Sequence, residues 1–69
     1  MSAAEEIREV VAVLHRAQEA GVDVGGLGEK WRARALAMEA APVGAGWEWL
    51  AAQGDEAAAR VVELERRRP

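Results

Sequence analysis

The stretch Val24-Gly25-Gly26-Leu27-Gly28-Glu29-Lys30-Trp31 divides the chain into one helical segment before it and further helices after it. It contains three of the seven glycines and the only lysine. Inside a helix, glycine costs about 1 kcal/mol relative to alanine, so this density of glycines favours a connection. We therefore expect the chain to break here and the fold to be organised around the break.

The segment before the glycine stretch is predicted to form an amphipathic helix over about residues 3–20. Ile7, Val10 and Leu14 recur every three or four residues, which places them on one face of a helix. Ser2 and Glu5 match a capping box at its start. Gly21 is a suitable residue to end it.

Three further helices are predicted at about residues 29–41, 46–53 and 56–67. Pro42 ends the first of them, and Asp55 is a favourable N-cap for the last. The 29–41 helix is apolar on two sides, with Trp31 on one face and Leu36 on the other. Such a helix is either central in the core or covered by another chain.

Together these segments predict an all-α fold, a small helical bundle of three longer helices and one short helix. A chain of 69 residues forms one domain at most, here residues 1–69. It buries only about 60% of its unfolded surface. It has no cysteine that could form a disulfide. Small scaffolds without cross-links often gain buried area by association, so we expect a homo-oligomer or a subunit docked on another protein.

Charge and hydropathy limit the partners and the compartment. The formal net charge is −3, which argues against nucleic acid as the main partner. The longest apolar run, Val10 to Leu14, is far shorter than the ~20 residues that span a bilayer, so no membrane partner is expected. The acidic N-terminus lacks the plan of a signal peptide, which leaves the cytoplasm as the expected compartment.

Groups that perform catalysis are scarce. The only serine, Ser2, is explained as a helix cap and lies several helical turns from His15, the only histidine. His15 and Glu19 are one turn apart and offer two metal ligands, whereas zinc usually needs three or four, so we expect them to pair with each other. The sequence therefore predicts no catalytic residue, no metal site, no cofactor and no enzymatic activity.

The segment 24–36 resembles a helix-hairpin-helix DNA-binding motif. That family has a glycine–apolar–glycine turn followed by a helix with an early basic residue, and Gly26-Leu27-Gly28 and Lys30 match these positions. The resemblance implies that the N–H groups around Gly26 and Gly28 face a DNA phosphate. Glycines let a backbone approach an anion, and a helix N-terminus attracts one. The basic side chains of this surface would be Lys30, Arg32 and Arg34. A glycine-rich connection without a ligand is the other interpretation.

Trp47 and Trp49 point to nearly opposite sides of the predicted 46–53 helix. Tryptophan is enriched among interface anchors, so we predict a partner surface that includes Trp47, Trp49, Leu50 and Leu36. The other interpretation is that both indoles cover the core. The leading hypothesis is thus a small non-enzymatic protein–protein interaction module, acting as a homo-oligomer or as an adaptor or regulatory subunit. The alternative is a nucleic-acid-binding protein that uses the glycine loop at residues 24–30.

Overall fold

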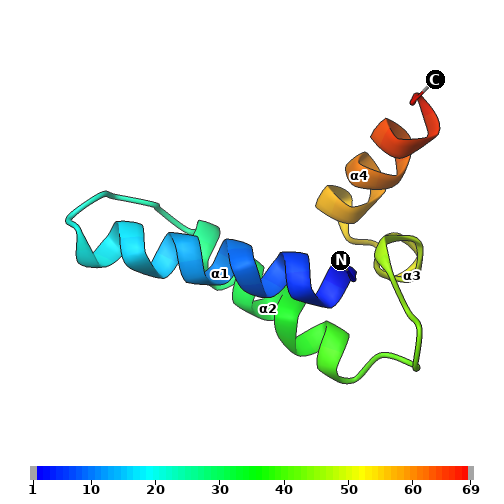
Figure 1. Ribbon diagram of the computed structural model, residues 1–69, viewed down its shortest axis with the longest axis horizontal. Coiled ribbons are helices and arrows are strands. Elements are labelled where there is room, and N and C mark those ends of the chain that lie inside the picture. The colour runs from blue at the N-terminus through cyan, green and yellow to red at the C-terminus, as the bar shows by residue number, and fades with distance from the viewer. Residues whose placement is uncertain (1, 69) are drawn as a thin grey trace.

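The computed structural model describes residues 2–68 as four α-helices (Figure 1). The helices are α1 (Ala3–Glu19), α2 (Leu27–Glu39), α3 (Trp47–Ala52) and α4 (Glu56–Arg66). Their lengths are 17, 13, 6 and 11 residues, and no strand occurs within residues 2–68. The predicted all-α class, with three longer helices and one short one, is confirmed. None of these helices is both long and apolar enough to cross a bilayer.

Local signals define both ends of α1. The Ser2 hydroxyl accepts a hydrogen bond from the Glu5 N–H at 3.2 Å, as the capping box predicts. At the other end Gly21 has a φ of +86°, which is unfavourable for a residue with a side chain. The N–H of Val22 then donates to the Ala17 carbonyl at 2.9 Å. This pattern satisfies carbonyls at the end of α1 and reverses the chain.

The connection after α1 is shorter than the glycine content predicts. The Asp23 carboxylate accepts from the Gly25 N–H at 2.9 Å, and Gly25 has a φ of +58°, so the turn is complete by Gly26. α2 therefore begins at Leu27, two residues before the predicted start, and Gly28 lies in its first turn. The cost of glycine is mainly the backbone entropy that it loses in a helix interior, and it does not prevent Gly28 from lying in the first turn.

The helices pack as two pairs. α1 and α2 run antiparallel side by side and form the first hairpin, and α3 and α4 pack together as the second hairpin (Figure 1). Gly54, with a φ of +92°, lies between α3 and α4. α4 points away from the first hairpin in Figure 1, so it does not cover the length of α1.

The core lies where the two hairpins meet. Ile7 of α1, Leu50 of α3 and Ala58 of α4 are almost fully buried and form one cluster. Trp31, on one of the two apolar faces of α2, packs against this cluster and is partly buried. The opposite face of α2 is open, because Leu36 is 65% exposed and no residue of α2 is fully buried. α2 is thus an outer helix with one covered face rather than a central one.

Candidate interaction groove

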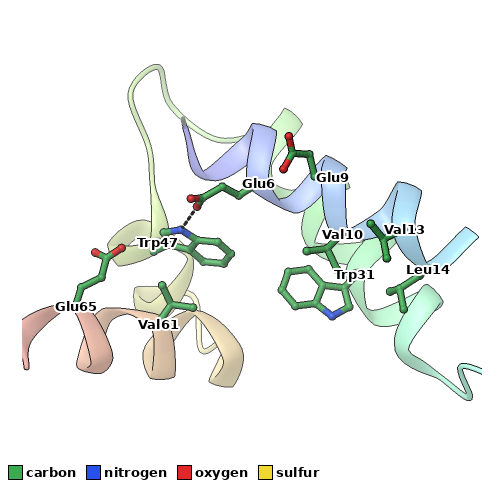
Figure 2. A pocket seen from close by; sticks show the side chains of 9 residues that line it. All are labelled: Glu6, Glu9, Val10, Val13, Leu14, Trp31, Trp47, Val61 and Glu65. Atoms are coloured by element: carbon green, nitrogen blue, oxygen red, sulfur yellow. Dashed lines mark hydrogen bonds between the residues drawn. The ribbon is translucent and has the colours of Figure 1, made fainter. Parts of the chain in front are cut away.

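A groove of about 550 Å³ opens between the two hairpins (Figure 2). One wall is formed by α1, through Val10, Val13 and Leu14. Trp31 of α2 adjoins this wall, and Trp47 of α3 and Val61 of α4 lie across from it. The groove exists because α4 diverges from α1 after the two hairpins meet.

The α1 wall is an apolar surface that the rest of the chain leaves open. Val10 and Leu14 are half-buried, and Val13 is 53% exposed. These side chains share one side of α1, since residues three and four apart are neighbours on a helix surface. The wall is therefore wider than the part of α1 that the protein's own core covers.

Two tryptophans from different hairpins meet at the groove. The rings of Trp31 and Trp47 have centroids 6.5 Å apart and planes at 83°, an edge-to-face arrangement. The Trp47 Nε1–H donates to the Glu6 carboxylate at 2.9 Å, drawn as a dashed line in Figure 2. The indole N–H is thus satisfied while the rings offer apolar surface.

The charge around the groove is of one sign. Glu6, Glu9 and Glu65 line it, and among the residues that the structure describes no lysine, arginine or histidine does. Arg68 lines an adjoining hollow with Glu6 and Glu65 but forms no ion pair with either of them. The groove thus combines an apolar wall with uncompensated carboxylates, which suits an occupant with apolar and cationic groups.

A shielded ion pair joins the two hairpins. The Arg34 Nε donates to both carboxylate oxygens of Asp55, at 3.0 and 2.8 Å. The guanidinium carbon lies 4.6 Å from the centroid of the Trp31 ring, close enough for a cation–π contact. Asp55 also accepts from the Ala58 N–H at 3.0 Å and so caps α4, as its sequence position predicts. One carboxylate therefore fixes the start of α4 and ties it to α2.

The environment of Asp55 changes its acidity. Burial by itself would raise the pKa of this carboxyl group. The hydrogen bond from the Ala58 N–H and the hydrogen bond and positive charge of Arg34 act the other way and together bring the pKa below its ordinary value of 3.8. The charged form of Asp55 is therefore the one that the fold stabilises.

The structure separates the four residues that the sequence groups as a partner surface. Trp47 lines the groove, and Trp49 is half-buried against the core. Leu36 lies on the outer face of α2, which does not line the groove. Leu50 is only 2% exposed, because it packs against Ile7 in the core. It therefore contributes to the stability of the fold and is not available to a partner.

Sequence reasoning missed the role of α1 in the groove. It placed Val10 and Leu14 on one apolar face of a helix and did not use Val13. The signal was present in the sequence, since Val10, Val13, Leu14 and Ala17 widen the apolar side of α1 beyond what one neighbouring helix covers.

The residues of the hairpin resemblance run from the N-cap of α2 to its middle, and they differ in what they contact. Gly26 caps α2 without a side-chain hydrogen bond, and Gly28 is in the first turn. Lys30 and Arg32 are exposed, whereas Arg34 is engaged with Asp55. Of the three predicted basic side chains, two are therefore available to a phosphate.

The predicted pairing of the single histidine is confirmed. His15 Nε2 lies 3.1 Å from Glu19 Oε1, one turn further along α1. Within residues 2–68 no group of three or more histidine, cysteine, aspartate or glutamate side chains is placed to hold a metal ion.

No family model, curated protein or solved structure matches the chain. The groove and the chemistry of its lining therefore carry the functional argument.

Proposed function

We propose that this chain is a small non-enzymatic protein–protein interaction module, acting as a homo-oligomer or as an adaptor or regulatory subunit, with the groove as its binding surface. The observation that carries the proposal is the uncovered apolar wall of α1 beside two indole rings. An apolar patch rimmed by polar residues is typical of an interaction site. Tryptophan side chains often supply a large share of binding energy.

The small core gives association a second reason. Within residues 2–68 the buried hydrophobic residues are few, and two of the four are alanines: Ala3, Ile7, Leu50 and Ala58. Each further 100 Å² of apolar surface removed from water contributes about 2.5 kcal/mol before the costs of association. A helix laid in the groove would cover Val10 and Val13 and complete a closed helical bundle from the two hairpins.

A photo-crosslinking amino acid in place of Val13 tests this proposal. Val22 provides a matched control, since it is 55% exposed against 53% for Val13 but lies in the connection before α2. We expect cross-links to protein from position 13, in the purified chain or in cells that express it, and few from position 22. Equal cross-linking from both positions, or none from position 13, would contradict the groove as the binding surface.

Nucleic-acid binding through residues 24–30 is the less supported alternative, because Arg34 is committed to Asp55. It requires binding that weakens steeply with salt. Fluorescence anisotropy with labelled duplex and single-stranded DNA at low salt tests it, and Lys30→Glu together with Arg32→Glu should abolish any signal that arises from this surface.

A further inference from the structure

We infer that the occupant of the groove is α1 of a second copy of this chain, in an antiparallel dimer with a two-fold axis near Val13. The inference rests on the proposed function, because it names the partner of the same groove. A two-fold interface requires a surface that is complementary to itself. Both the apolar and the charged side chains of α1 meet that requirement.

The apolar residues of the wall lie close to the middle of α1. Val10 and Leu14 are equally far from position 12, and Val13 is the next residue along the chain. In an antiparallel pair of α1 helices, Val10 of one copy lies against Leu14 of the other, and the two Val13 side chains meet near the axis. The pairing therefore covers Val13, the most exposed apolar residue of the groove, in both copies.

The charges of α1 decide the direction of the pairing. Glu9 and Arg16 are seven residues apart, which places them on the same side of a helix, about 10 Å apart along its axis. Both are exposed, and neither forms an ion pair within residues 2–68. Antiparallel pairing sets Arg16 of each copy against Glu9 of the other. Parallel pairing would set Glu9 against Glu9.

The acidic end of the groove supplies a further partner for the same arginine. Glu6, Glu9 and Glu65 line the groove without a cation among the described residues. Arg16 lies one turn beyond Val13, so antiparallel pairing carries it toward this end of the other copy. The second copy thus provides an apolar surface to cover the α1 wall and a cation for the carboxylates, and α1 is its own complement.

Charge reversal tests the pairing without disturbing the core, because both residues are exposed. We expect Glu9→Arg and Arg16→Glu each to weaken the dimer, measured by sedimentation equilibrium, by about 10-fold or more, since like charges then meet twice across the two-fold axis. The double variant should bring the dissociation constant back close to that of the unmodified chain. Arg8→Glu makes the same charge change on another side of α1 and should leave the dimer intact.

A cysteine in place of Val13 tests the position of the axis. The chain has no cysteine of its own, so a disulfide can form only between two introduced residues. We expect Val13→Cys to oxidise to a covalent dimer at protein concentrations where Val22→Cys forms no disulfide-linked dimer. Far-UV circular dichroism of each variant verifies that the helices are retained.

The outcomes separate this inference from the proposed function. Three results together support α1 pairing: each single charge reversal weakens the dimer, the double variant restores it, and Val13→Cys traps it as a covalent dimer. A chain that stays monomeric at all concentrations overturns it, while cross-links from position 13 to a different protein would leave the proposed function standing. A dimer that ignores the charge reversals and is not trapped at position 13 overturns it too, and indicates a different face.

Discussion

Within residues 2–68 two polar contacts link the first hairpin to the second, and one is shielded from water while the other is exposed. The Arg34–Asp55 pair joins α2 to the start of α4 with side chains that are only 15% and 17% exposed. The Trp47–Glu6 hydrogen bond joins α3 to α1 at the solvent-exposed edge of the groove. In the inner contact, the Arg34 Nε–H is shared by both carboxylate oxygens of Asp55 and the two groups carry opposite charges, whereas the outer contact is one hydrogen bond from a neutral indole. The inner contact is therefore the stronger of the two polar links, and it lies beside the apolar cluster of Ile7, Leu50 and Ala58 that also joins the hairpins.

The difference has a functional meaning under the proposed role of the groove. A shielded charge left without its partner is costly, so the inner contact resists change. An exposed hydrogen bond exchanges with water at little cost, so the Glu6 carboxylate is free to turn toward an occupant. The Arg34–Asp55 pair thus keeps the hairpins in a fixed arrangement, while the Glu6 side chain at the edge of the groove can adapt to an occupant.

The largest effect is expected from Asp55→Ala, which removes the cap of α4 and the partner of Arg34 together. We expect the free energy of unfolding to fall by about 2–3 kcal/mol, measured by urea denaturation followed by circular dichroism. Asp55→Asn is the matched control, because asparagine still caps a helix, and it should cost about 1 kcal/mol. Equal losses in both variants would show that the cap contributes nothing.

Acidification should weaken the same contact. The folded state lowers the pKa of Asp55, so its contribution to stability is fully present above the ordinary value of 3.8 and disappears as the pH falls through the lower folded pKa. We expect the stability difference between the unmodified chain and Asp55→Asn to be constant near neutral pH and to shrink below that value. A difference that grows on acidification would contradict the role of the charged carboxylate.

The outer contact should couple its two residues only weakly. We expect Glu6→Ala and Trp47→Phe to show a coupling energy below about 1 kcal/mol in a double-mutant cycle, as for a single exposed hydrogen bond. The matching cycle with Arg34→Ala and Asp55→Ala should give a clearly larger coupling. Similar values in the two cycles would remove the distinction between inner and outer contacts.

The smallest effect is expected for the pair within α1. His15 and Glu19 have side chains that are 56% and 69% exposed, and surface ion pairs contribute little. We expect His15→Ala to change the free energy of unfolding by less than about 0.5 kcal/mol. This pair is the reference for a polar contact within one helix. If His15→Ala lowered the free energy of unfolding as much as Asp55→Asn, solvent exposure would not determine how much each contact contributes to stability.

Features that depend on a few neighbouring residues were predictable from the sequence. The caps at Ser2 and Asp55 and the stop at Gly21 each involve groups within a few positions, and all three are confirmed. The start of α2 was predicted late, because the turn at Asp23 and Gly25 is complete sooner than glycine content alone indicates.

Features that depend on the packing of the hairpins were not predictable. Arg34 and Asp55 are 21 residues apart, and nothing local to either identifies the other. Leu50, Trp47 and Trp49 are all large apolar residues of α3. Which of them is buried depends on which side of α3 packs against the core, and the sequence does not determine that side. The groove itself follows from the divergence of α4, which hydrophobic periodicity does not encode.

The edge-to-face contact of Trp31 and Trp47 also gives the chain an intrinsic spectroscopic probe of how its two hairpins are arranged. The protein contains no tyrosine or phenylalanine, so its near-ultraviolet circular dichroism comes from three indoles alone. Two of these belong to different hairpins and are close enough for their electronic transitions to couple. A rotation of one hairpin against the other would alter the near-ultraviolet signal of these indoles while the helical content stayed constant. Hinge motion and unfolding would then be distinguishable in a single unlabelled sample.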